Sequence, residues 1–393
     1  MCAWTLRLIA SAGMVCLAIQ PGLAQDEPRL DRIAQAQSGL APRAPSAAAS
    51  GEAGLVARAN EWTVGLAGGT PSGTFMRFAA EIARNVNQAG EARVLAVVTP
   101  GATENVKDLL YLKGMDIAIT HADVLEHFRN VEKIPNIQKR VNFISELYVS
   151  EVHVLVRSEI NSFKDLAGKK VSFHAPGGGS SVTGPILFQR MGVKVQPVFI
   201  DNEVAYEQMK TGEVAGLVFT VGKPNNLFTR NKNDHGFKFL PVPFDNFTDL
   251  YLPTKLTAED YPGYVKPGET VETIGVQAVL AVYNWPRESD RFRRIGRFID
   301  TYFDRFDNFL KPPYHPSWKT INLAADVRGW NRYWAVEAKL KQLMAARNAG
   351  AAKARGGDAQ LAREGTQRAP GKADDKERLF QEFLQWSKTH GRR

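Results

Sequence analysis

The sequence predicts an α/β protein of two lobes with a ligand cleft between them, and three observations support this prediction. Strand-like and helix-like segments alternate along the chain after residue 59. The alternation begins a second time after residue 157. Turns rich in Gly, Ser and Thr follow the strands in both halves. Such alternation is typical of a mainly parallel sheet covered by helices, and ligands of these sheets bind at the carboxyl ends of the strands.

The first half contains three strand–helix pairs, each marked by an apolar run and then by apolar residues at helical spacing. The predicted strands are Thr63–Ala67, Arg93–Val98 and Asp116–Thr120. The predicted helices that follow them are Thr74–Asn87, Glu104–Leu112 and Ala122–Phe128.

The second half follows the apolar stretch His153–Arg157 and repeats this order. Its predicted strands are Lys170–His174, Val195–Ile200 and Gly216–Thr220, and its predicted helices are Ser180–Gln189 and Val204–Lys210. Farther along, Thr273–Tyr283 is long and apolar at two-residue spacing, so we expect a strand that crosses back to the first lobe. Basic residues between 291 and 297 share a helical pattern with apolar ones, which predicts an amphipathic helix with a solvated face.

The start of the chain predicts export. Residues 1–7 carry one basic side chain, residues 8–19 are apolar, and Gly22-Leu23-Ala24 offers small residues for cleavage. This is the pattern of a secretory signal peptide that is removed after Ala24, and it places the protein in the periplasm. The alternatives are a buried N-terminal helix and lipidation at Cys16. Both cysteines lie in this segment, so we expect no disulfide and no thiolate metal site in the mature chain.

Shifts in composition mark the boundaries of the expected domains. Residues 25–58 and 345–376 are poor in large apolar groups, which predicts flexible linkers. Between them we expect the first part of lobe 1 at 59–154, lobe 2 at 155–245, and a return to lobe 1 with C-terminal helices at 246–344. Residues 377–393 carry an apolar stripe at helical spacing. We expect an amphipathic helix there that docks on its own body or on a partner, or that stays free.

Charge and loop motifs argue against nucleic acid and nucleotides as ligands. The formal net charge is +9, but the chain contains no recognisable nucleic-acid-binding module. The first glycine loop, GLAGGTPSGTF, has the glycine spacing of a phosphate loop between Gly68 and Gly73, but Thr74 stands where that motif requires Lys. The sequence therefore indicates no cofactor. What remains is a helix N-terminus with free N–H groups, which attracts anions and carboxylates.

The same feature recurs in both halves of the chain. Comparable turns span residues 99–105, 120–123, 175–183 and 221–224. One such turn is ordinary helix capping, but several turns that follow strands in two lobes favour a lined cleft.

Five segments in this order resemble one family of receptors. They are GLAGGTPSGTF, GATENVKDLLYLKGMDIAIT, HADVLEHF, SEVHVLVRSEINSFKDLAGKKVSF and APGGGSSVTGPILFQRMGV. Over roughly residues 60–320 the chain resembles the TAXI receptors, the extracytoplasmic solute-binding proteins of TRAP transporters. The resemblance implies a two-lobed periplasmic binding protein fold of type II-like architecture. It also implies that the cleft closes on a small solute, which passes to a membrane permease driven by an ion gradient.

The resemblance also implies a set of ligand-binding residues, and no catalytic or metal-binding ones. The set is Gly69, Thr70, Thr74, Gly101, Thr103, Asn105, Thr120, His121, Asp123, Tyr148, Ser180, Ser181, Thr183 and Gly222. His121 departs from the family, where Gln-Ser-Asp is more usual at this strand end. If His121 faces the ligand, we expect affinity for an anion to rise as pH falls through about 6.5. A neutral histidine in the core is the alternative, and core packing is likewise the alternative for Tyr148.

The solute and the downstream partner stay open at this point. The pocket loops contain no Arg for a bidentate carboxylate clamp, but helix N-termini and hydroxyls suit an organic acid or an amino acid. The main alternative function is a periplasmic sensor subunit that signals to a membrane kinase. An envelope scaffold is a further alternative. An enzyme is not expected, because the chain has no GxSxG or HExxH motif and no base can be assigned to Ser180.

Overall fold

The computed structural model describes residues 51–346. The described residues divide into two units between Ala57 and Arg58. Helix α2 (Glu52–Glu61) spans this boundary, and all other described elements belong to the second unit. The predicted signal peptide, most of the first linker, the second linker and the amphipathic C-terminal helix lie outside the described residues, and so they remain predictions.

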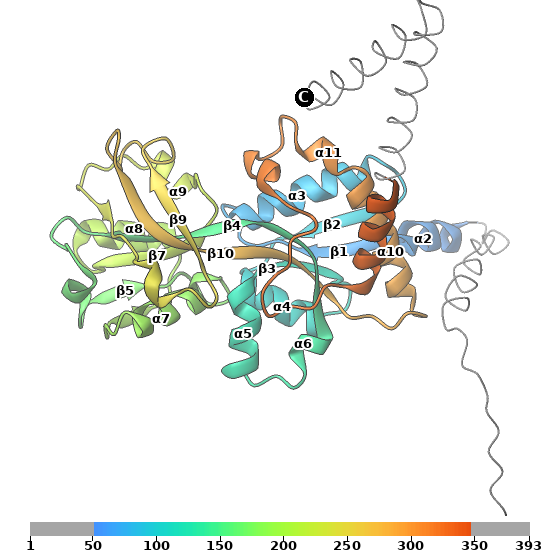
Figure 1. The fold of residues 1–393 in the computed structure, drawn as a ribbon, viewed down its shortest axis with the longest axis horizontal. Helices are drawn as coiled ribbons and strands as arrows, with labels where there is room; N and C mark the ends of the chain where they lie inside the picture. Colours follow the sequence, from blue (N-terminus) through green and yellow to red (C-terminus); the bar gives the residue numbers. More distant parts are fainter. Residues whose placement is uncertain (1–50, 347–393) are drawn as a thin grey trace, which may run out of the picture. The chain divides into compact units, whose positions relative to one another are not determined.

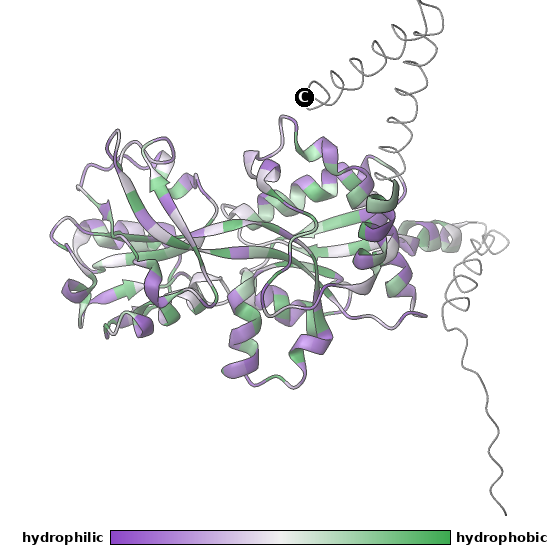
Figure 2. Cartoon of the chain, in the orientation of Figure 1, coloured by the Kyte–Doolittle hydropathy of each residue, from purple (hydrophilic) through white to green (hydrophobic). Residues whose placement is uncertain are grey.

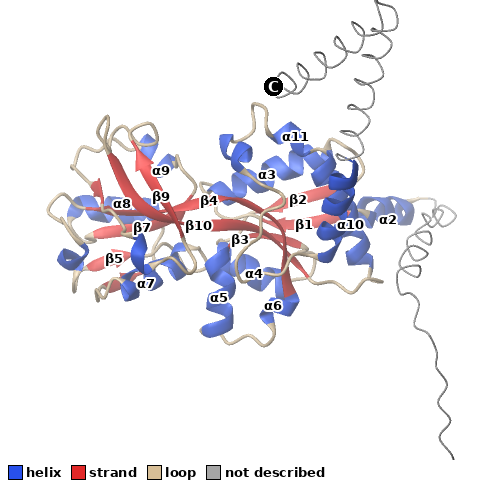
Figure 3. Ribbon diagram, viewed as in Figure 1, coloured by secondary structure: helices blue, strands red, loops and turns tan. Residues whose placement is uncertain are grey.

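The second unit is built on one mixed β-sheet (Figures 1 and 3). Its strands are β1 (Thr63–Ala67), β2 (Arg93–Val97), β3 (Ile117–His121), β4 (Val141–Val156), β5 (Lys170–Ser172), β6 (Gln196–Val198), β7 (Gly216–Val221), β8 (Lys238–Phe239), β9 (Leu252–Thr257) and β10 (Thr270–Tyr283). The main path through the sheet is β2-β1-β3-β10-β4-β7-β5-β6, with β8 beside β4 and β9 beside β10.

Helices flank this sheet on both faces (Figure 1). They are α3 (Thr74–Asn87), α4 (Ala102–Tyr111), α5 (Ala122–Asn130), α6 (Ile137–Arg140), α7 (Ser180–Arg190), α8 (Asn202–Thr211), α9 (Asn226–Arg230), α10 (Asp290–Asp304) and α11 (Phe306–Phe309), with 3-10 turns at Phe163–Leu166, Phe244–Asn246 and Pro316–Thr320. No helix among these described elements is long and apolar enough to span a bilayer.

The long strands β4 and β10 divide the sheet into two lobes. Lobe 1 holds β1, β2 and β3 with α3, α4 and α5, and lobe 2 holds β5, β6 and β7 with α7, α8 and α9. The amino-terminal part of β4 pairs with β10, whereas its last residues, Glu151–Val156, pair with β7. Both strands run through the centre of Figure 1. The predicted α/β fold class with two lobes is confirmed.

The prediction of a mainly parallel sheet is wrong. Parallel ladders join β1 to β2 and β3, and β5 to β6 and β7. The ladders of β4 and β10 with their neighbours are antiparallel. The reason is that β4 and β10 pass between the lobes in opposite directions, so each lobe is parallel only at its outer part. The full length of β4 could not be predicted from the sequence, because buried polar residues such as Ser145 and Ser150 interrupt its apolar pattern.

Within each lobe the apolar faces of the helices pack as their spacing predicts. In α3 the buried residues include Phe75, Phe78, Ile82 and Val86, which recur every three or four positions and form one face. Helix α10 begins at Ser289, whose side chain accepts the Phe292 N–H at 3.2 Å. Apolar residues concentrate on the central strands, and hydrophilic ones line the outer faces of helices (Figure 2).

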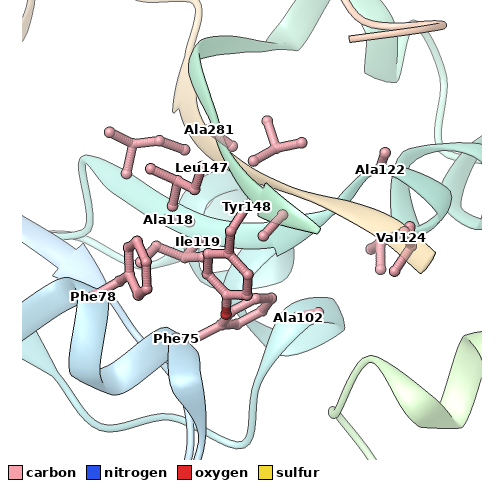
Figure 4. Packing of buried hydrophobic residues seen from close by; sticks show 14 of the residues in the cluster. Phe75, Phe78, Ala102, Ala118, Ile119, Ala122, Val124, Leu147, Tyr148 and Ala281 are labelled. Atoms are coloured by element: carbon pink, nitrogen blue, oxygen red, sulfur yellow. The ribbon is translucent and has the colours of Figure 1, made fainter. Parts of the chain in front are cut away.

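Aromatic rings stack in the core beneath α3. The Phe78 ring lies 4.5 Å from that of Trp318, which in turn lies 4.0 Å from that of Phe309. The indole N–H of Trp318 donates to Glu81 at 2.6 Å. The ring of Tyr148 in β4 also lies 4.5 Å from that of Phe78 (Figure 4). This stack therefore connects α3 to the long strand β4 and to the segment that follows α11.

Truncating Phe78 tests the importance of this stack. We expect Phe78→Ala to lower the free energy of unfolding by ~3–5 kcal/mol, because it removes a fully buried ring from between two others. Phe199→Ala is the matched control, since that ring is 43% exposed and should cost less than about 1 kcal/mol. Urea denaturation of both variants measures the difference, and equal losses would show that the stack adds no stability of its own.

Candidate functional site

An open cavity lies between the two lobes, and its volume is about 390 Å³ including its mouth. Its lining residues are Gly69, Thr70, Gly73, Thr74, Phe75, Pro100, Gly101, Ala102, His121, Tyr148, Ser150, His174, Gly178, Gly179, Ser180, Phe219, Thr220 and Val221. These residues come from strand ends, turns and helix starts of both lobes and from the middle of β4. Among them, all within the described part of the chain, there is no Asp, Glu, Lys or Arg. The cavity wall is thus polar but carries no formal charge when its histidines are neutral.

Helices α3, α4, α5 and α7 all begin at this cavity. Their N-cap residues are Gly73, Gly101, His121 and Gly179, and each of these lines the cavity. None of these four described helices has a side-chain hydrogen bond at its N-cap. Helix N-termini carry partial positive charge and N–H groups without intrahelical partners. The arrangement therefore directs the dipoles of four helices at one space, although the Thr103 and Glu104 N–H groups of α4 already donate to Gly177 O.

Four side chains of the lining hold buried polar atoms that have no hydrogen-bond partner within residues 51–346. They are Nδ1 of His121, the hydroxyl oxygen of Tyr148, Nδ1 of His174 and Oγ1 of Thr220. The side chains come from both lobes, and each residue is at most 6% exposed. Buried polar groups are nearly always paired in folded proteins, so such atoms at one cavity are the feature expected of a site that awaits a polar ligand.

His121 is neutral over the physiological range, contrary to the expectation of a switch near pH 6.5. Burial lowers its pKa to about 3. Its Nε2 lies 2.9 Å from Ser150 Oγ, and its ring packs edge-on against Phe75 at 4.7 Å. Burial therefore argues against titration of this histidine near pH 6.5 in the unliganded protein, and the pH dependence of anion affinity stays a prediction. Its neutral ring can offer Nδ1 as a donor or as an acceptor, depending on the tautomer.

Tyr148 both lines the cavity and packs in the core. Its ring belongs to the buried core, beside Phe75 and Phe78 (Figure 4). The same residue lines the cavity. Together with Phe75 and Phe219 it gives the cavity an apolar wall between the backbone donors.

Half of the predicted ligand-binding residues line the cavity, and the other half do not. Those in the lining are Gly69, Thr70, Thr74, Gly101, His121, Tyr148 and Ser180. Those outside the lining are Thr103, Asn105, Thr120, Asp123, Ser181, Thr183 and Gly222.

Asn105 is committed to the fold of lobe 1. Its amide donates to the carbonyl oxygens of Gly68 and Ile119, each at 2.6 Å. Its oxygen accepts from the hydroxyl of Thr99 at 2.5 Å. Thr120 is similarly occupied, because its hydroxyl donates to Ala102 O at 2.9 Å. These two side chains shape the strand ends and turns of lobe 1, and neither lines the cavity.

Asp123, Thr183 and Thr103 join the lobes to each other. The Thr183 hydroxyl of α7 donates to Oδ2 of Asp123 in α5 at 2.7 Å, and Tyr251 donates to the same oxygen at 3.0 Å. Burial raises the pKa of Asp123 to about 6, although these hydrogen bonds oppose the rise. The backbone N–H of Thr103 donates to Gly177 O at 3.0 Å.

The remaining predicted ligand-binding residues, Ser181 and Gly222, lie beside the cavity. The neighbouring Lys223 is considered with them because it is a cation that follows strand β7. Ser181 donates to Gly178 O at 2.6 Å, within its own turn. Gly222 O accepts from Thr74 Oγ1 at 3.4 Å. The ammonium of Lys223 pairs with Asp260 at 2.8 Å and with Lys255 O at 2.7 Å. This cation is therefore engaged in lobe 2 and is absent from the lining.

Sequence reasoning missed Ser150, His174, Phe219 and Thr220 in the lining. Ser150 lies in a part of β4 that the sequence does not predict to be a strand. For Phe219 and Thr220 the sequence predicts a strand but no position in the cavity. His174 was assigned to a strand end, but its backbone has a φ of 63°. That left-handed conformation is uncommon outside glycine and is found at functional sites. No sequence pattern signals it, although a histidine directly before a glycine-rich turn is a usable hint.

The fold and the cavity define a class: an α/β protein whose two lobes enclose a polar cleft at their strand ends. The chain belongs to the NMT1-like family, whose model matches residues 66–328.

Several solved structures are distantly similar to this chain. The periplasmic binding protein BugD shares 15% identity over 71% of this chain and 93% of its own, with a TM-score of 0.44. The alkanesulfonate-binding protein SsuA from Xanthomonas axonopodis pv. citri, bound to MOPS, shares 15% identity over 71% and 83%, with a TM-score of 0.42. The periplasmic aliphatic sulphonate binding protein SsuA from Escherichia coli shares 14% over 63% and 73%, with a TM-score of 0.38.

The position of Asn105 predicts a loss of stability when it is replaced. We expect Asn105→Leu to lower the free energy of unfolding by about 3 kcal/mol or more, because it leaves two buried carbonyls and a hydroxyl without their hydrogen-bond partner. Ser181→Ala is the control, since it removes one local bond from a half-buried residue. Chemical denaturation measures both. An Asn105→Leu protein with unaltered stability would return this residue to the list of candidate ligand contacts.

The raised pKa of Asp123 predicts a pH-dependent difference between the wild type and Asp123→Asn. In the folded chain the Asp123 carboxyl group keeps its proton up to about pH 6, whereas its reference pKa is 3.8. The stabilisation that comes from protonated Asp123 is thus complete below pH 3.8 and is lost as pH rises through 6. Asparagine keeps the acceptor oxygen and cannot ionise. From pH 4 to pH 7 the wild type should lose on the order of 2–3 kcal/mol relative to the variant. Urea midpoints at several pH values measure this, and a constant difference would contradict it.

Proposed function

We propose that this protein is an extracytoplasmic solute-binding protein that captures a small polar or anionic solute in the cleft between its lobes. The observation that supports the proposal most is the convergence of four helix N-termini from both lobes on one uncharged cavity. Such termini favour anions through their dipoles. The buried, unpartnered atoms of His121, His174 and Thr220 favour a polar ligand as well.

The cavity suits a compact solute of the organic acid or amino acid class. The empty space of about 390 Å³ includes open solvent at the mouth, so the enclosed part has room only for a small molecule. Backbone amides supply the donors for a carboxylate. The rings of Phe75, Tyr148 and Phe219 supply an apolar surface for the body of the solute. Gly69, Thr70, Thr74, Gly101, His121, Tyr148 and Ser180 are the proposed contacts, and no residue is assigned a catalytic role.

We further propose that the protein works in the periplasm and delivers its solute to a TRAP-type permease driven by an ion gradient. The signal-peptide pattern of residues 1–24 and the resemblance to the TAXI receptors support this. The test is reconstitution of the TRAP permease of the same organism in vesicles. Uptake of the solute under an ion gradient should require this protein, and uptake at the same rate without it would refute the delivery step.

A thermal-shift screen followed by a charge-matched pair of variants tests solute capture. At a concentration 100 times its dissociation constant, a true ligand should stabilise the protein by about 2.7 kcal/mol. The screen should contain carboxylates, amino acids, inorganic anions and amines. Thr70 lines the cavity and is only partly buried, so it tolerates replacement by Asp and by Asn.

For an anion we expect Thr70→Asp to bind at least about tenfold more weakly than Thr70→Asn, because only the former places a negative charge beside the ligand. Calorimetry of the two variants makes the comparison. Equal affinities would show that the solute is neutral, and stabilisation by amines alone would refute the proposed role of the helix N-termini.

A further inference from the structure

The lobes meet through glycines, and this contact points to a function of its own. Gly177, Gly179 and Gly222 of lobe 2 face Pro100, His121 and Tyr148 of lobe 1. We name the three glycines of lobe 2 the glycine seam. A Cβ added at Gly179 would lie 2.2 Å from Nδ1 of His121. One at Gly222 would lie 2.7 Å from Cε2 of Tyr148, and one at Gly177 would lie 2.7 Å from Cβ of Pro100.

These distances leave no room for any side chain while the lobes stay as close as they are. A real Cβ is not found within 3.0 Å of another heavy atom, so one of the two groups must shift. The obstructing ring of His121 cannot swing away freely, because it is held by Ser150 and Phe75. The Tyr148 ring is likewise fixed between Phe75 and Phe78. Separation of the lobes is therefore the available relief.

Backbone strain does not explain the glycine at position 179. Its φ and ψ are −63° and −39°, which any residue adopts. The requirement is thus set by the facing lobe and not by the turn itself. Gly177 differs, because its φ of 92° also favours glycine.

Hydrogen bonds across the same contact stabilise the close approach of the two lobes. Thr183 donates to Asp123, Thr74 donates to Gly222 O, and the Thr103 N–H donates to Gly177 O. Each of these bonds joins one lobe to the other. The acceptors Gly222 and Gly177 belong to the glycine seam, and the acceptor Asp123 lies at the start of α5. Any side chain that held the lobes apart would break these bonds together.

We propose that Gly179 and Gly222 are positioning residues for closure of the cleft: their missing side chains permit the closed arrangement, and His121 and Tyr148 are the groups they must clear. The proposal rests on the proposed function only in treating this arrangement as one state of a cleft that opens and closes. Solute affinity depends on the closed population, so an alanine at either position should weaken binding by the factor by which it reduces closure.

Disulfide trapping tests closure without any solute. Asp123 and Thr183 are hydrogen bonded across the lobes at 2.7 Å in this arrangement, so we expect cysteines at these two positions to cross-link faster when the lobes are closed. Cys2 and Cys16 are replaced by serine. In this background we expect Gly179→Ala to slow cross-linking by about tenfold or more, as the usual cost of overpacking implies. Gly296→Ala is the matched control, because a Cβ there meets nothing within 4 Å, and its cross-linking rate should not change.

A suppressor separates closure from misfolding. Adding His121→Ala to Gly179→Ala removes the obstructing ring and should restore cross-linking to within about threefold of the His121→Ala protein. The parallel pair, Gly222→Ala with and without Tyr148→Ala, repeats the test at the other contact and serves if the first variant does not fold. Cross-linking of both alanine variants at the background rate, or slowing that neither suppressor relieves, would overturn the proposal. Failure to find a solute would refute the proposed function and leave this result unaffected.

Discussion

The antiparallel pairing of β4 with β10 is the interaction on which the rest of the structure depends. These two strands are the longest in the described part of the chain, and their ladder holds the two halves of the sheet together. The same strands pair outward with β3 in lobe 1 and with β7 in lobe 2. Since the path between the lobes is sheet and not loop, the strand ends of both lobes are brought to a common region, and the cavity lies there.

The composition of the cavity follows from this geometry. In each lobe a parallel strand is followed by a turn and then by a helix that packs back on the sheet, so each turn ends in a helix N-terminus. Two lobes that face each other therefore direct these termini at one space. Close approach of the turns requires small residues, which explains why glycine, serine and threonine occupy them. Hydroxyls and backbone amides then supply the polar groups that the side chains do not.

Much of the fold could be predicted from the sequence, because local patterns of apolar residues and glycines indicate where strands, turns and helices lie. The bounds of Thr63–Ala67 and Thr74–Asn87 were correct to the residue, since an apolar strand, a glycine turn and an amphipathic helix are each local signals. The direction of β4 and β10 could not be predicted, because pairing is decided by contacts far apart in sequence. Likewise the sequence indicates glycine-rich turns that line the cavity, but not the hydrogen bonds that their side chains make. Nothing near Asn105 in the sequence indicates that its amide reaches Gly68 and Ile119. The inward position of His174 depends on a left-handed backbone that propensities do not reveal.

A cavity whose donors come largely from the backbone has a consequence for how the protein can change by mutation. A codon change replaces a side chain, but it cannot remove an amide N–H unless it introduces proline. The electropositive character of the four helix ends is thus inherited with the fold itself. The exchangeable parts are the rings of Phe75, Tyr148 and Phe219 and the two imidazoles. Descendants of such a chain can therefore alter the shape they accept in single steps, while the polarity of what they accept stays nearly constant.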